Sequence, residues 1–159
     1  MVARKKPVIA VVGAGKCSKK LRDMAAEVGK YVAENGGVLI CGGMGGVMEG
    51  AARGAKEAGG TTIGVLPTES KDDANEFIDY VIATGIGDAR NLIVVRSADA
   101  VVALPGKYGT LTEMAFALLA EIPVVSVSAW KLGEEVEQFD DPVKAAAAAM
   151  KMAGAAKKA

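Results

Sequence analysis

The chain has 159 residues, 51% of them hydrophobic, and its 19 basic residues equal its 19 acidic residues in number. This length predicts one domain with a sizeable core. The zero net charge provides no overall field to gather nucleic acid or an acidic membrane surface. The chain has no histidine, which excludes Ser-His-Asp and Cys-His catalysis and the common zinc sites.

The sequence gives no sign of a membrane or metal protein. No apolar run reaches the roughly 18 residues that a membrane-spanning helix needs. The short apolar run near the N-terminus leads into a glycine loop instead of a cleavage site, so we interpret it as a buried strand and expect a cytoplasmic protein. Cys17 and Cys41 lack metal-type spacing. We expect two reduced thiols, no metal and no resident cofactor.

Strands and helices are predicted to alternate along the chain. The continuous apolar run 7–12 is typical of a covered parallel strand, and further strands are predicted at 38–41, 61–66, 80–83, 99–104 and 123–127. Helical patterns lie between them at about 19–34, 47–58, 89–97 and 111–121, and a last helix starts at Asp141-Pro142. Residues 67–75 form a polar loop and 130–139 are irregular. The tail 152–159 is predicted to fray.

This alternation predicts an α/β fold, a single Rossmann-like domain over residues 1–159 with a parallel sheet and helices on both faces. Glycine-bearing loops follow four of the strands, after Val12, Cys41, Ala83 and Leu104. In such sheets ligands bind outside the carboxyl ends of the strands. We therefore expect these loops to meet at one edge and to bind a nucleotide or another small phosphorylated molecule.

The loop with the clearest chemistry lies in 104–113, LPGKYGTLTE. A strand, a glycine turn and a helix N-terminus follow one another there, which directs several backbone N–H groups at one spot and favours an anion. Lys107 either contacts a phosphate or is solvated, and Tyr108 either stacks on a base or packs on the helix. The candidate ligand-binding residues of this loop are Pro105, Gly106, Lys107, Tyr108, Gly109 and Thr110.

Two earlier glycine loops are candidates for the same ligand. GAGKCS, with Gly13, Gly15 and Ser18, resembles half of a dinucleotide fingerprint, but no acid follows the second strand to bind a ribose, so NAD or FAD is not expected. The loop either contacts a mononucleotide or is a structural turn. GGMGGVMEG, with Gly42, Gly43, Met44 and Gly45, lacks the Gly-Lys-Ser/Thr ending of a P-loop, which argues against hydrolysis of adenosine triphosphate.

Two charged side chains are candidates for catalysis. Thr110 and Glu113 have the T-x-x-E spacing of a capping box, so Glu113 either caps a helix, faces the anion site, or does both. Arg90, followed by Asn91, opens an apolar helix. Its guanidinium is either solvated and ion-paired or directed at a phosphate or a leaving base.

Three segments, GGMGGVMEGAARGA, GDARN and PGKYGTLTE, together resemble the motifs of the Lonely Guy family, in order and spacing, over roughly residues 7–128. Characterised members split a nucleoside 5′-monophosphate into base and ribose 5-phosphate. The resemblance implies that Glu113 and Arg90 are catalytic, that 42–46 and 106–110 bind phosphate and ribose, and that the protein forms a homodimer or a higher homo-oligomer.

The chain departs from the family pattern beside the arginine. GDARN stands where the family usually has M-H-x-R-K, and Lys107 replaces the second glycine of P-G-G. These changes resemble the branch that includes the molybdenum-cofactor carrier proteins. The sequence therefore supports a phosphoribohydrolase acting on adenosine monophosphate, with a carrier of a phosphorylated pterin as the alternative. A nucleic-acid partner is not expected, because the chain has few aromatic residues and no basic run.

Overall fold

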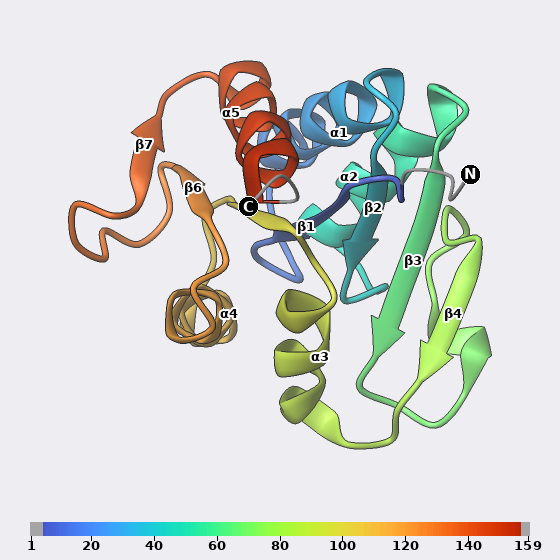
Figure 1. The fold of residues 1–159 in the computed structure, drawn as a ribbon. Helices are drawn as coiled ribbons and strands as arrows, with labels where there is room; N and C mark the ends of the chain where they lie inside the picture. Colours follow the sequence, from blue (N-terminus) through green and yellow to red (C-terminus); the bar gives the residue numbers. More distant parts are fainter. Residues whose placement is uncertain (1–4, 157–159) are drawn as a thin grey trace.

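The computed structural model describes residues 5–156. A single sheet of seven parallel strands forms the centre of the molecule, in the order β4-β3-β2-β1-β5-β6-β7 (Figure 1). The predicted single α/β domain is confirmed. The strands are β1 (Val8–Val12), β2 (Val38–Cys41), β3 (Thr61–Leu66), β4 (Tyr80–Ala83), β5 (Ala100–Ala103), β6 (Val124–Val127) and β7 (Glu137–Phe139).

Helices cover both faces of this sheet, as the sequence predicts (Figure 1). None of the helices between residues 5 and 156 is long and apolar enough to cross a membrane. The α-helices are α1 (Lys19–Glu34), α2 (Val47–Glu57), α3 (Arg90–Arg96), α4 (Tyr108–Leu119) and α5 (Pro142–Ala156), with short 3-10 turns η1 (Lys71–Asp73) and η2 (Gly87–Ala89).

Alternate side chains of the central strand β1 belong to two separate hydrophobic cores, one on each face of the sheet. Ile9 and Val11 pack with α1, α2 and α5 on one face, while Ala10 and Val12 pack with α3 and α4 on the other. All four side chains are almost completely buried. A strand that is apolar on both faces fits only the middle of a sheet with helices on each side, which explains the continuous apolar run in the sequence.

Helices α1 and α2 touch backbone to backbone. A Cβ at Gly54 would lie 2.6 Å from the carbonyl carbon of Ala26, and one at Gly29 would lie 2.8 Å from that of Ala51. The glycines that weaken a helix in isolation are therefore required here for close approach.

The order in which the chain adds strands to the sheet changes direction at β1, and β5 lies on the other side of it. From β1 the strands are added outward to β4, and the chain then returns to place β5 beside β1 and continues to β7. Loops that follow two such neighbouring strands diverge and leave a crevice at their carboxyl ends. The glycine loops after Val12 and Leu104 flank this crevice.

Three local predictions are wrong. Helix α4 begins at Tyr108, three residues earlier than expected, so Thr110 and Glu113 lie inside it and form no capping box; no side chain caps it. The region 130–139 contains the short edge strand β7, whose polar sequence hides its pairing with β6. Residues 152–156 continue α5 instead of fraying, and 157–159 lie outside the described residues.

Candidate functional site

A cavity of about 310 Å³ opens at the crevice between β1 and β5. Its walls come from the loop after β1, from η2 and the start of α3, and from the loop and first turns of α4. The residues that line it are Val12, Gly13, Ala14, Gly15, Lys16, Met48, Asp88, Arg90, Asn91, Lys107, Gly109, Thr110 and Glu113.

Backbone hydrogen bonds fasten the loops around this cavity to one another. Ala14 N–H donates to the carbonyl of Pro105 at 3.0 Å, and Val47 N–H donates to the carbonyl of Ala14 at 2.9 Å. Gly46 has a φ of +63° and lies so close to Ala14 that a Cβ would overlap its carbonyl. The loops after β1, β2 and β5 therefore form one connected unit at the sheet edge.

Glu113 is the most unusual side chain of the site. It lies in the second turn of α4, is only 7% exposed and lines the cavity. No hydrogen bond or ion pair of its carboxyl group is found among the described residues. Burial raises its pKa to about 8, and the nearby Arg90 offsets only part of this rise. At neutral pH the Glu113 carboxyl group is therefore largely protonated.

Arg90 is anchored to the ends of two strands. Its Nη1 donates to the carbonyl of Gly42, after β2, and to that of Val65, in β3, the latter at 2.6 Å. Its Nε donates to Asn91 Oδ1 at 2.9 Å. A side chain at Gly42 would collide with this guanidinium and with Met48, which explains the glycine at that position.

The Arg90 guanidinium is only partly neutralised by its surroundings. Burial lowers its pKa, whereas the carboxylates of Glu113 and Asp88 raise it. Among the described residues Nη2 has no hydrogen bond, and the residue lines the cavity. One donor group of Arg90 is therefore left for a ligand.

The cavity combines cationic groups with two acids. Lys16 and Lys107 are exposed at its rim and Arg90 lies deeper, while Asp88 and Glu113 supply the carboxyl groups. The first turn of α4 has backbone N–H groups without helical partners, including those of Gly109 and Thr110. Positive charge and free amides favour a phosphate or another small anion.

Eight of the predicted site residues line the cavity and eight do not. Gly13, Gly15, Arg90, Asn91, Lys107, Gly109, Thr110 and Glu113 lie in its wall. The remaining residues support the loops or lie elsewhere, and their roles in binding stay predictions. These are Ser18, Gly42, Gly43, Met44, Gly45, Pro105, Gly106 and Tyr108.

Two of these residues have clear local roles. Ser18 caps α1, accepting a hydrogen bond from Leu21 N–H at 3.2 Å. Tyr108 is 75% exposed and stacks on Trp130, with ring centroids 6.1 Å apart. The Trp130 ring also donates from Nε1 to the carbonyl of Lys107 at 3.1 Å.

Sequence reasoning missed five residues of the cavity wall: Val12, Ala14, Lys16, Met48 and Asp88. Two of them carry charge. Lys16 lies inside GAGKCS, and Asp88 lies inside GDARN, so both motifs contained the signal. In each motif the charged side chain lies beside the glycines or the arginine that identify the motif.

The sequence profile of the SLOG cluster4 family matches residues 6–156. The chain belongs to this family. The resemblance that the motifs indicate is therefore confirmed, both by the profile and by relatives of known name.

Three relatives illustrate this similarity. An uncharacterized protein of Archaeoglobus fulgidus is 44% identical over 86% of this chain and 90% of its own length. A protein of Oryza sativa subsp. japonica, named as a probable cytokinin riboside 5′-monophosphate phosphoribohydrolase, is 37% identical over 70% of this chain. The alignment spans only 46% of that rice protein. The Moco carrier protein of Chlamydomonas reinhardtii has a solved structure with a TM-score of 0.84 and 40% identity, covering 95% of this chain and 99% of that one.

Proposed function

We propose that this protein binds a nucleoside 5′-monophosphate and hydrolyses its N-glycosidic bond, converting adenosine monophosphate to adenine and ribose 5-phosphate. The observation that carries the proposal is Glu113, a buried carboxyl group without a partner among the described residues, in the wall of a cavity rimmed by cationic side chains and helix amides. The rice relative, which is named for the same class of reaction, supports the assignment.

In the proposed reaction the amides of Gly109 and Thr110, together with Lys107, hold the phosphate, which positions the reacting carbon in the cavity. The bond between C1′ and the base nitrogen breaks, and its electron pair leaves with the base. Positive charge then develops on the ribose, as in other glycoside cleavages. A water molecule supplies the oxygen that bonds to C1′.

Two side chains assist this step. The protonated Glu113 gives its proton to the departing base, and the resulting carboxylate stabilises the ribose cation and takes a proton from the attacking water. Protons therefore balance over one turnover. The free Nη2 of Arg90 faces the phosphate or the base, while its other bonds keep the guanidinium fixed.

Incubation of the purified protein with adenosine monophosphate, followed by chromatography, tests this function. Free adenine and ribose 5-phosphate should appear together. Glu113→Gln keeps the shape of the side chain but has no proton to transfer, and we expect it to reduce turnover by about a hundredfold or more. Equal turnover by both proteins would remove Glu113 from the mechanism.

A second candidate is a carrier that holds a phosphorylated pterin without turnover. It is favoured by Asp88 and Asn91, which line the cavity where the Lonely Guy pattern has a histidine and a lysine. The similarity to the Chlamydomonas carrier supports it. Fluorescent pterin released on denaturation, with no adenine from adenosine monophosphate, would favour the carrier over the hydrolase.

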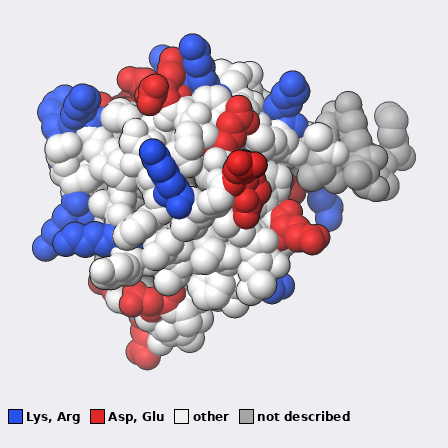
Figure 2. Space-filling view, turned by 90° about the vertical axis from the view of Figure 1, so that its left-hand side faces the viewer, with Lys and Arg blue, Asp and Glu red and all other residues white. Residues whose placement is uncertain are grey.

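We propose that two copies of the chain associate through α3 and α4. The only charged residue of α4, Glu113, points into the cavity, and the outer surface of the helix exposes Ala115 and Leu119, the latter 79% exposed. Ile93 of α3 is 37% exposed. Figure 2 views the molecule from the side of β7 and shows a broad area without charged side chains. An uncharged area that exposes apolar side chains such as Leu119 and Ile93 fits a subunit interface.

The same proposal includes the setting in which the protein works. We place it in the cytoplasm, because its two cysteines, Cys17 and Cys41, are unpaired in the structure. Its partner is a small phosphorylated ligand and not a nucleic acid, because the basic residues do not exceed the acidic ones.

A further inference from the structure

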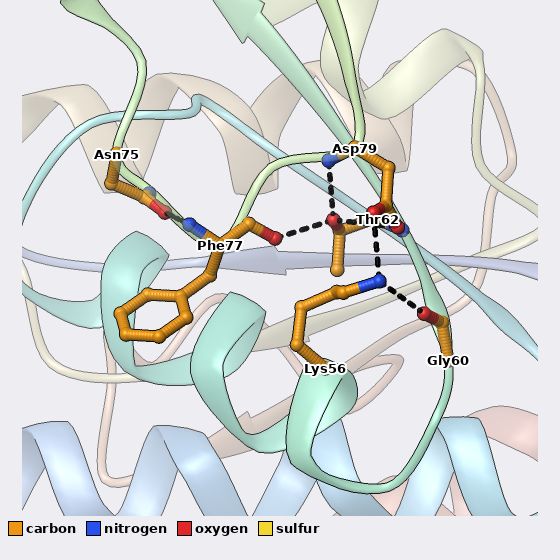
Figure 3. Close-up of polar contacts among 6 residues, drawn as sticks. All are labelled: Lys56, Gly60, Thr62, Asn75, Phe77 and Asp79. Carbon is orange, nitrogen blue, oxygen red and sulfur yellow. Dashed lines mark hydrogen bonds and ion pairs between the residues drawn. The ribbon is translucent and has the colours of Figure 1, made fainter.

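The crossover between β3 and β4 lacks the long helix that usually covers a parallel sheet and runs instead as an irregular strap, residues 67–79, with only the short turn η1. Its far end is fixed in place. Asp79 accepts hydrogen bonds from Thr62 N–H at 2.9 Å and from Lys56 Nζ at 2.7 Å, and Thr62 Oγ1 donates to the carbonyl of Phe77 at 2.6 Å (Figure 3). The Phe77 ring packs against the core.

One residue of this strap reaches the glycine loop after β2. Asn75 N–H donates to the carbonyl of Gly43 at 2.9 Å, and its Nδ2 donates to the carbonyl of Met44 at 2.8 Å. Its Oδ1 accepts from Phe77 N–H at 3.0 Å, which holds the amide group in this orientation (Figure 3). Asn75 therefore binds two successive carbonyl groups of the loop.

The two bound carbonyl groups determine where the neighbouring amides point. In a planar trans peptide the C=O of one residue and the N–H of the next point in opposite directions. The N–H groups of Met44 and Gly45 therefore point away from Asn75. Among residues 5–156 neither of them has a hydrogen-bond partner. Successive free N–H groups in a glycine turn form a concave binding place for an anion.

The same loop also touches the cavity wall. A Cβ at Gly45 would lie 3.1 Å from the carbonyl oxygen of Gly15, which lines the cavity. Gly42, at the other end of the loop, supplies the carbonyl that binds Arg90 Nη1. A change at Asn75 would therefore reach both the free amides and the guanidinium.

We propose that Asn75 is a positioning residue of the ligand site: it orients the loop 42–46 so that the Met44 and Gly45 amides and the Arg90 guanidinium bind the phosphate of the ligand from the side opposite the first turn of α4. The strap is then a fixed support for the site, and not a lid that closes over it. This inference rests on one part of the proposed function, that the ligand is phosphorylated, and does not require that the ligand is hydrolysed.

The test compares Asn75→Asp with the wild type and with Lys56→Met. Asp at position 75 keeps the acceptor for Phe77 N–H and the backbone bond to Gly43, but it cannot donate to Met44. Calorimetric titration should show about tenfold weaker binding of adenosine monophosphate and of inorganic phosphate, since one fixed hydrogen bond is worth about that factor. Adenosine, which has no phosphate, should bind equally to both proteins.

Lys56→Met is the matched control, because it loosens the same strap at Asp79 without touching the glycine loop. It should bind adenosine monophosphate within about twofold of the wild type, even where its melting temperature is lower. If the control weakens phosphate binding as much as Asn75→Asp, or if Asn75→Asp binds normally, the positioning role is wrong.

Nuclear magnetic resonance of the wild type tests the same proposal without any variant. Addition of inorganic phosphate should shift the amide resonances of Met44 and Gly45 and slow their hydrogen exchange. Unchanged resonances, or a wild type that binds neither phosphate nor adenosine monophosphate, would overturn the inference. Phosphate binding without release of adenine would instead reject only the hydrolase.

Discussion

Glu113 and Arg90 influence each other in the cavity without forming a salt bridge. Each shifts the pKa of the other toward its charged form, but burial is the larger effect on both. The guanidinium is already bound to two backbone carbonyls, and the carboxyl group is left for the ligand. The pair therefore provides an acid and a fixed cation side by side, which a closed ion pair would not.

The first prediction concerns the pH dependence of stability. The pKa of Glu113 is raised from an ordinary value of 4.5 to about 8, so the folded state retains a proton that the unfolded state releases. The contribution of this group to stability is fully present below pH 4.5 and is lost as the pH rises toward about 8. Urea unfolding of Glu113→Gln should lack this decline between pH 5 and pH 8.

A glutamate on the surface provides the control for the lost charge. Glu134 is exposed in the segment between β6 and β7. Glu134→Gln should retain the full decline of the wild type. The interpretation of Glu113 fails if Glu113→Gln and the wild type lose stability in parallel over this pH range.

The second prediction concerns the geometry of Arg90. Arg90→Lys keeps the positive charge, but an ammonium group cannot reproduce the planar fork that binds two carbonyls and Asn91. We expect a loss of about 1–3 kcal/mol in the free energy of unfolding and at least tenfold lower turnover of adenosine monophosphate. Arg96→Lys, on the exposed end of the same helix, should change neither quantity.

The third prediction concerns the close contact of α1 with α2. Gly54→Ala would push a methyl group into the backbone at Ala26, and we expect it to cost more than about 2 kcal/mol of stability. Gly154→Ala, in a helix with open space around that position, should stabilise the protein by about 0.5–1 kcal/mol. Thermal unfolding of the two variants should therefore shift in opposite directions.

The fourth prediction concerns the subunit interface. Leu119→Glu places a charge in the apolar area of α4, and we expect it to convert a dimer into monomers in light scattering coupled to gel filtration. Val143→Glu, on an exposed apolar residue of α5, is the control and should leave the dimer intact. A wild type that is monomeric at high concentration would contradict the proposed association.

The sequence predicted the parts of this structure that depend on repeated patterns. Mostly apolar segments identified six of the strands, and the glycines after Val12 and Leu104 located the edge where the cavity lies. Both signals are local in the sequence. Because ligands bind at the carboxyl ends of parallel strands, they were enough to predict that these glycine loops meet at one binding site.

The failures arose where tertiary contacts override local patterns. Thr110 and Glu113 have the spacing of a capping box, but α4 begins earlier at Tyr108, and the carboxyl group is buried against the cavity instead. Strand β7 depends on pairing with β6, which its polar sequence does not indicate. The bonds from Asn75 to the glycine loop join residues more than thirty positions apart, so no sequence spacing could predict them.

The bond from Trp130 to the carbonyl of Lys107 gives the protein an internal optical reporter. Trp130 is the single tryptophan of the chain. Its indole N–H donates a hydrogen bond to Lys107, the residue just before α4 at the rim of the cavity. Any movement of that rim alters the surroundings of one chromophore. The tryptophan fluorescence of the unlabelled protein therefore reports ligand binding or movement at the loop before α4, without an added dye or a coupled assay.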